Sequence, residues 1–251
     1  MSERTGYDAI ASFYDVDMAL NMPFDDASLY RAIARRTGGR ILELGCGSGR
    51  ILLPLMVDGR DIVGVDASRS MLRELTTKAA GRELEPAVAC MDARTLAFGE
   101  CFDLVLCPYS FITFMSGTED ATRMMREILR VLKPDGAVVL DAFVPKRVER
   151  FQDFRVDYRR PFGQNTLERS KRITALGGRT NRIERRYRLE SPDGELLQEV
   201  DTREDIQTFR PEDLLALLAQ SGLVASEEWW NYTSHRADEE AQFFTVLAGR
   251  R

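Results

Sequence analysis

An apolar, strand-like segment that runs directly into three alternating glycines constrains the fold of this chain more than any other feature. Residues 41–44 (Ile-Leu-Glu-Leu) are typical of a buried strand, and Gly45, Gly47 and Gly49 follow at every second position. Glycine has no Cβ, so the backbone here can turn sharply and lie close to a ligand. We expect a helix from residue 50 to about 58, whose free N–H groups face a carboxylate or phosphate. The segment therefore predicts a strand, a ligand-binding turn and a helix.

An acidic residue at the end of the next predicted strand narrows the class of ligand. Asp66 follows Val63-Gly64-Val65, and in a doubly wound sheet an acidic side chain at this place hydrogen-bonds ribose hydroxyls. The glycine turn and Asp66 together predict a nucleoside-containing cofactor. Dinucleotide sites use the spacing G-x-G-x-x-G. Because Arg50 takes the place of the last glycine, the spacing argues against a dinucleotide.

Five segments, in the same order, resemble the motifs of class I S-adenosylmethionine (SAM) methyltransferases over roughly residues 5–141. The run from Glu43 to Gly49 is similar to their E/D-x-G-x-G-x-G motif, and Asp66 to their ribose-binding acidic residue. Met91-Asp92-Ala93 resembles the turn after their third strand. Residues 102–106 and 129–140 resemble their fourth strand and the Leu-Lys-Pro turn into the fifth. The resemblance implies SAM as cofactor and S-adenosyl-L-homocysteine as product.

The resemblance also implies which residues bind SAM. Glu43 is expected to pair with the ammonium of the methionine part, Asp66 to bind the ribose and Asp92 to accept from the adenine amino group. A turn cap is the alternative role for Asp92. Met71 would pack on the adenine, although a methionine at such spacing is also typical of ordinary core. The full set of expected cofactor contacts is Tyr14, Glu43, Gly45, Cys46, Gly47, Asp66, Ala67, Met71, Asp92 and Ala93.

Two residues are candidates for a catalytic role. Tyr109 follows Cys107-Pro108 after the fourth predicted strand, at the sheet edge where such folds place substrate-facing groups. Methyltransferases of nucleobase or glutamine amines carry N/D-P-P-Y/F here, so the missing Asn or Asp argues against those substrates. A packing role is the alternative for Tyr109. His235, the only histidine, titrates near neutrality and is the general-base candidate, with a solvated loop residue as the alternative.

The N-terminal segment predicts a helix from residue 7 to 19. Its pattern, Tyr7-Asp8-x-Ile10-Ala11-x-x-Tyr14-Asp15, resembles the "Y-D-x-x-A-x-x-Y-D" helix of many small-molecule methyltransferases. That helix acts as a lid over the cofactor, which makes Tyr14 the expected contact. A second helix is expected at 26–36, closed by two glycines.

The order of predicted elements divides the chain into a main α/β domain, residues 1–142 and 209–251, and an antiparallel β insert, residues 143–208. Alternating strands and helices from 40 to 141 predict a Rossmann-like, mostly parallel sheet of seven strands with an antiparallel final strand. The insert is expected to hold strands around 166–175, 180–190 and 195–208, with a basic middle strand facing an acidic third strand. We expect it to cap the substrate, to contact a second copy in a homodimer, or both.

Composition bounds the partners and the location. The net charge of −5 provides no basic field for a nucleic acid, and the apolar runs are too short to span a membrane. The four cysteines have no C-x-x-C spacing, so we expect reduced thiols in a cytoplasmic protein and no metal site. The N-terminus shows no secretion signal.

These observations predict SAM-dependent methylation of a small molecule. The layout resembles aminosugar N-methyltransferases of antibiotic biosynthesis, so an amine is the expected acceptor. Methyl transfer from a sulfonium mainly requires a well-placed nucleophile and exclusion of water, so the lack of a catalytic triad does not count against it. Three alternatives stay open: O- or C-methylation of a small molecule, methylation of tRNA or protein, and SAM binding without methylation.

Overall fold

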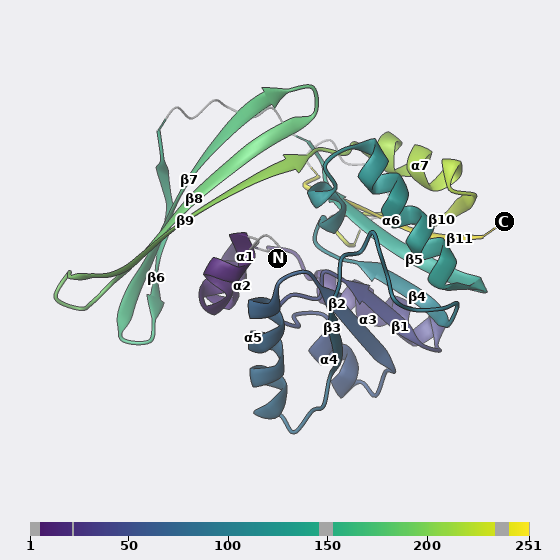
Figure 1. Ribbon diagram of the computed structural model, residues 1–251, viewed down its shortest axis with the longest axis horizontal. Helices are drawn as coiled ribbons and strands as arrows, with labels where there is room; N and C mark the ends of the chain where they lie inside the picture. The colour runs from purple at the N-terminus through teal and green to yellow at the C-terminus, as the bar shows by residue number, and fades with distance from the viewer. Residues whose placement is uncertain (1–5, 22, 146–152, 234–240, 251) are drawn as a thin grey trace.

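The computed structural model describes residues 6–21, 23–145, 153–233 and 241–250, and contains two separate sheets (Figure 1). The larger sheet has seven strands in the order β10-β11-β5-β4-β1-β2-β3. These strands are β1 (Ile41–Leu44), β2 (Ile62–Asp66), β3 (Ala87–Cys90), β4 (Phe102–Cys107), β5 (Leu132–Phe143), β10 (Leu223–Trp230) and β11 (Phe243–Arg250). Neighbouring strands pair in parallel except at β11, which is antiparallel to both β5 and β10. The predicted Rossmann-like sheet with an antiparallel final strand is confirmed.

Helices cover both faces of this sheet, as the continuous apolar strands require. One face packs against α3 (Asp26–Thr37), α4 (Leu52–Val57) and α5 (Arg69–Ala80). The other face packs against α6 (Thr118–Val131) and α7 (Pro211–Gln220). The sequence marks several helix starts: the side chains of Asp25 and Ser68 cap α3 and α5, and α7 begins with Pro211.

The smaller sheet lies within the insert and has the order β6-β7-β8-β9, with every pair antiparallel. Its strands are β6 (Arg155–Phe162), β7 (Asn165–Gly177), β8 (Thr180–Glu190) and β9 (Leu196–Gln207). The sequence analysis expected three of these strands and missed β6. This segment is rich in charged residues and most of it is exposed, so it shows no clear apolar alternation. Its partner β7 supplies the pairing that makes it a strand.

The N-terminal segment lies between the two sheets (Figure 1). The expected single helix is interrupted: α1 (Gly6–Ile10) and α2 (Tyr14–Asn21) are joined by a 3₁₀ turn, η1 (Ala11–Phe13). Ile10 and Phe13, around the interruption, pack with Leu167 and Tyr187 in a small apolar cluster of the insert. We call α1, η1 and α2 the lid. Among the described residues, no helix is long and apolar enough to cross a membrane.

Candidate functional site

The residues with the strongest functional signal lie at the carboxyl ends of the parallel strands. Glu43 is in β1, Asp66 ends β2, and Asp141 is near the end of β5. The turn after β1 lies beside the end of β4, because β1 and β4 are neighbours in the sheet. From the boundary between β1 and β4, the chain continues to β2 and β3 on one side and to β5 on the other. Open α/β sheets bind ligands at such a reversal of the strand order.

The glycine turn is held against Asp66. The Gly47 N–H donates to Asp66 Oδ2 at 2.8 Å, and the Ser68 N–H donates to Oδ1 at 2.8 Å. Gly45 and Gly47 have φ angles of 69° and 52°, which favour glycine. A Cβ at Gly45 would lie 2.3 Å from the Phe111 ring, so no larger residue fits there. The following helix, α4, has only six residues and is shorter than the sequence predicted.

Glu43 is a buried carboxyl group for which no ion pair is found within the described part of the chain. It is 2% exposed, and its Oε2 has no hydrogen-bond partner among those residues. Burial raises the pKa of Glu43 well above its usual value. An unpaired buried carboxyl is unfavourable, and a ligand ammonium at this place would relieve that cost. The burial of Glu43 and its unsatisfied oxygen are therefore compatible with the expected role of this residue toward the ammonium of SAM.

Tyr14 and Met71 approach the glycine turn from two elements. Tyr14, on the lid, packs edge-to-face with Tyr7 at a centroid distance of 5.9 Å, and burial raises its pKa well above the usual value. Met71, in the first turn of α5, is 2% exposed, and a Cβ at Gly47 would lie 3.2 Å from its methyl carbon. Met71 therefore lies beside the turn, and Tyr14 lies close enough to Arg50 and Asp66 for their charges to act on its hydroxyl.

Four further residues that were expected to contact SAM differ from one another in burial and in their partners. The Cys46 side chain is buried against Gly64, so only its backbone faces the turn. Ala67 is exposed, whereas Ala93 is buried in the core. Asp92 accepts from the Arg94 N–H at 2.8 Å and forms an ion pair with its guanidinium at 2.6 Å. The turn-cap role named as the alternative for Asp92 is therefore present.

Tyr109 lies on the segment that follows β4. Tyr109 and Ser110 both have φ angles of 56°, a conformation that non-glycine residues rarely adopt. The Tyr109 ring packs edge-to-face on Phe143 at 5.5 Å, and the Arg50 Cζ lies 5.5 Å from its centroid. Burial raises the Tyr109 pKa. The second catalytic candidate, His235, lies outside the described residues.

The lid is tied to the cofactor side by the two aspartates of its sequence pattern. Asp8 accepts from Ser68 Oγ at 2.7 Å, directly after the Asp66–Ala67 strand end. Asp15 accepts from Ser48 Oγ in the glycine turn at 2.7 Å, and from Lys78 at 2.8 Å. The lid pattern thus supplies hydrogen bonds to both loops that surround the expected cofactor.

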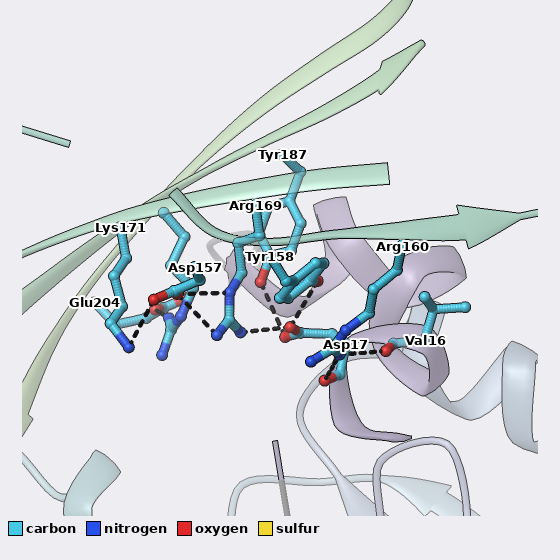
Figure 2. Close-up of polar contacts among 10 residues, drawn as sticks. Val16, Asp17, Asp157, Tyr158, Arg160, Arg169, Lys171, Tyr187 and Glu204 are labelled. Carbon is cyan, nitrogen blue, oxygen red and sulfur yellow. Dashed lines mark hydrogen bonds and ion pairs between the residues drawn. The ribbon is translucent and has the colours of Figure 1, made fainter. Parts of the chain in front are cut away.

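The opposite side of the lid is bound to the insert through Asp17 (Figure 2). Asp17 is 6% exposed and forms an ion pair with Arg169 of β7. Its carboxylate also accepts from the hydroxyls of Tyr158 at 2.8 Å and Tyr187 at 3.1 Å. Arg169 pairs in turn with Asp157 at 2.9 Å. This network joins α2 of the lid to β6, β7 and β8 of the insert, whose side chains in contact with Asp17 come 141 to 170 residues later in the sequence.

Sequence reasoning missed the roles of Asp17 and Asp141. Asp141 follows the apolar run Val138-Val139-Leu140, as Asp66 follows its own strand, and that similarity was an available signal. Asp17 carries no such signal, because its partners lie more than 140 residues away.

Comparisons with known proteins agree with this geometry. Residues 41–136 match the family described as methyltransferase domain. The cypemycin N-terminal methyltransferase of Streptomyces sp is 33% identical over 152 residues, which are 60% of this chain and 61% of that relative. The dTDP-4-amino-2,3,4,6-tetradeoxy-D-glucose N,N-dimethyltransferase of Saccharopolyspora spinosa is 26% identical over 187 residues, 74% of this chain and 71% of that protein.

Among solved structures, a SAM-dependent methyltransferase from Clostridium acetobutylicum ATCC 824 has the same fold. Its TM-score is 0.80 at 17% identity, with 97% of this chain and 98% of that chain covered. The family match covers the strands and turns that carry Glu43, the glycines, Asp66 and Asp92. Residues 41–136 therefore match a methyltransferase domain, and the fold of the chain is that of a SAM-dependent methyltransferase.

Proposed function

We propose that this protein methylates an amine of a small molecule, with SAM as the methyl donor. The observation that carries the proposal is the gathering of Tyr7 and Tyr14 of the lid with Tyr109 of the segment after β4. Tyr7 packs on Tyr14 and, at 5.6 Å, on Phe114. An acceptor that reaches this place is enclosed by aromatic rings, which suits a small molecule better than a large polymer.

The charges around these tyrosines support an amine. Glu204 of β9 forms an ion pair with Arg185. Its Oε1 is buried next to Gly6 of the lid and has no hydrogen-bond partner among the described residues. Aromatic faces attract a cationic or partly cationic group. The insert therefore adds both a carboxylate and a guanidinium to the space beside Tyr7, and we propose that it caps the acceptor.

The residues of the chain have mainly positioning tasks in this reaction. Bound SAM supplies a methyl group activated by the neighbouring sulfonium. Because burial raises the pKa of Tyr14 and Tyr109, both hydroxyls stay protonated at neutral pH. Their oxygens can accept hydrogen bonds from the N–H groups of an amine and so direct its free lone pair at the methyl group, while the lid and the insert exclude water. His235 stays the proposed general base; turnover reduced less than about tenfold in His235→Ala would contradict that role.

A second acceptor class is favoured by one observation. The cypemycin N-terminal methyltransferase is, by its name, an enzyme that methylates a peptide N-terminus. The α-amine of a peptide presents the same chemical group as a small amine, on a chain that must extend out of the site. An α-amine acceptor is therefore the alternative to an aminosugar or related secondary metabolite.

A transfer assay with methyl-labelled SAM distinguishes these acceptors. Separate pools would contain small amines including aminosugars, peptides with a free N-terminus, and bulk tRNA, with products read by mass spectrometry. We expect label in the small-amine pool only. Label in peptides would favour the alternative, and label in tRNA would contradict the proposal. Asp66→Ala serves as the inactive control in every pool.

The proposal extends to assembly and location. The insert exposes Val156, Leu196 and Leu197, at 59%, 44% and 49%, and we propose that it also contacts a second copy in a homodimer. Light scattering of the full chain and of a variant with all three changed to Ser would test this. The four cysteines are free, in keeping with a proposed cytoplasmic location, which cell fractionation would test.

A further inference from the structure

Asp141 is a fully buried carboxylate that no step of the proposed reaction uses. It lies in β5 with an exposed fraction of 0%. No ion pair to it is found among the described residues. A buried carboxylate is stable only when hydrogen-bond donors replace its water, so its partners identify what it holds in place.

Four donors converge on this one side chain. The hydroxyl of Tyr30 in α3 donates to Oδ2, and the hydroxyl of Tyr232 donates to the same oxygen at 2.9 Å. The backbone N–H of Tyr109 donates to Oδ2 at 3.0 Å, and the N–H of Ser110 donates to Oδ1. Asp141 therefore connects α3, the end of β10 and the segment after β4.

The two amides belong to the two residues with strained backbone. Tyr109 and Ser110 both have a φ of 56°, and each non-glycine residue in this left-handed region is disfavoured. The Ser110 hydroxyl is buried and has no hydrogen-bond partner in the part of the chain that the structure describes, so its side chain does not explain the conformation. The carboxylate explains it, because only with both N–H groups turned inward can they share one acceptor group.

The strained segment contacts both the proposed acceptor space, through Tyr109, and the glycine turn, through Phe111. The Tyr109 ring packs on Phe143 and beside Arg50, at the edge of the space that we propose for the acceptor. Phe111, two residues on, lies against Gly45 of the glycine turn. If the segment relaxed to ordinary backbone angles, both rings would turn away from these positions. The strain is therefore stored where it sets the direction of substrate-facing groups.

We propose that Asp141 is a positioning residue for methyl transfer: its buried carboxylate holds Tyr109 and Ser110 in the left-handed conformation and so directs the Tyr109 ring toward the acceptor. This inference rests on the proposed function for its catalytic part. The interaction of Asp141 with the Tyr109 and Ser110 amides does not involve an acceptor, so it can be measured on the protein alone.

Protonation of Asp141 should have two opposite effects: it stabilises the fold, and it weakens the hydrogen bonds to the Tyr109 and Ser110 amides. Burial raises its pKa to about 6, against the lowering effect of the donors. The titratable and charged groups nearby are Tyr30 and Asp26 of α3, Tyr232, Cys107 of β4, and Arg50, which pairs with Asp26 at 2.6 Å. A carboxyl with a raised pKa favours the fold more as pH falls through that value. The same protonation weakens its hold on the two amides.

The test compares Asp141→Asn with two matched variants by amide hydrogen exchange of residues 108–111. The substitution keeps the volume but leaves one acceptor oxygen for four donors, so we expect exchange at least about tenfold faster. Adding Ser110→Gly, which tolerates positive φ, should recover part of the protection and of the turnover. Thr245→Val is the control: Thr245 lies opposite Asp141 on β11 and is equally buried, so we expect exchange as in the wild type.

Turnover is then measured with the acceptor that the pooled assay identifies. We expect kcat to fall at least about tenfold in Asp141→Asn, and to recover in part with Ser110→Gly. Unchanged exchange in Asp141→Asn would overturn the inference, and so would faster exchange with unchanged turnover.

If Asp141→Asn does not fold, amide exchange of the wild type between pH 5 and 8 decides instead. After correction for the intrinsic exchange rates, the exchange rate of residues 108–111 must rise below pH 6 while the free energy of unfolding of the whole protein increases. Absence of any methyl transfer by the wild type would contradict the proposed function only, because the exchange result still decides whether Asp141 holds the segment.

Discussion

The two sheets of this protein are stabilised in different ways. The seven-stranded sheet has an apolar interior in which strands such as β1 are buried throughout. The insert has a small apolar cluster around Leu167 and Tyr187, and arginine–carboxylate pairs cross its strands, as between Arg182 and Asp205 at 2.7 Å and Arg186 and Asp201 at 2.8 Å. Apolar burial provides most of the stability of the first sheet, whereas exposed pairs add little individually.

The difference extends to the buried carboxylates. In the insert and lid, Asp17 and Glu204 each have an arginine partner. At the carboxyl ends of the larger sheet, no ion pair to Glu43 or Asp141 occurs among the described residues. Asp17 and Glu204, which have an arginine partner, connect the lid and the insert. Glu43 and Asp141, which have no ion pair among the described residues, lie where a ligand is expected or where backbone N–H groups are bound. Unbalanced buried charge thus marks the candidate site.

The largest expected effect comes from removing the cation of a balanced pair. In Arg169→Met, Asp17 stays buried without its guanidinium, and we expect a loss of about 3 kcal/mol in the free energy of unfolding. Urea denaturation measures it. The matched control is Asp17→Asn with Arg169→Met, which should recover much of the loss, because it leaves no charge at residue 17 and Asp157 keeps its ion pair with Lys171 at 3.0 Å. A single variant as stable as the double would contradict the account.

A slightly smaller effect is expected at the cofactor site. Asp66→Ala removes the acceptor for the ribose and the partner of Gly47 and Ser68, so the Kd for SAM should rise about a hundredfold. Calorimetric titration measures this value. Asp61→Ala is the control, since Asp61 lies five residues earlier and its side chain is 68% exposed. Normal SAM binding by Asp66→Ala would show that the site is wrongly placed.

Glu43→Gln should separate stability from binding. The amide keeps the shape but loses the charge, so we expect the Kd for SAM to rise about tenfold while the ligand-free protein becomes more stable at pH 8. Because the pKa of Glu43 is raised by burial, ligand-free wild type should gain stability as pH falls, and the variant should show less of that gain. Denaturation at pH 5 and pH 8, with and without SAM, checks both signs. A variant that loses stability would indicate that Glu43 is balanced after all.

The smallest effect is expected on the outer face of the insert. Arg182→Ala removes an exposed pair with Asp205, and we expect the melting temperature to change by less than about 2 °C. Calorimetry with Asp205→Ala as the partner control measures it. A large loss would mean that exposed pairs, and not the buried network around Asp17, hold the insert.

Most of the fold could be predicted because its signals are local. The glycine turn, the cap at Ser68 and the proline that begins α7 each lie within a few residues of the structure they specify. The basic and acidic strands of the insert were also expected to pair, and their register confirms it. The strand β6 and the break in the lid helix were not predicted, because both depend on packing between distant segments.

The candidate site also combines features that local sequence shows with features that depend on long-range packing. The sequence alone determined the class of fold, the cofactor family and the strand ends at which Glu43, Asp66 and Tyr109 lie, since alternation, turn residues and motif spacing are read along the chain. Only the tertiary structure decided which carboxylates have a cation. Asp17 meets Arg169 across 152 residues, and Asp141 meets Tyr30 across 111. Burial and charge balance arise from these long-range contacts, so no local pattern could show that Glu43 and Asp141 are the unbalanced ones.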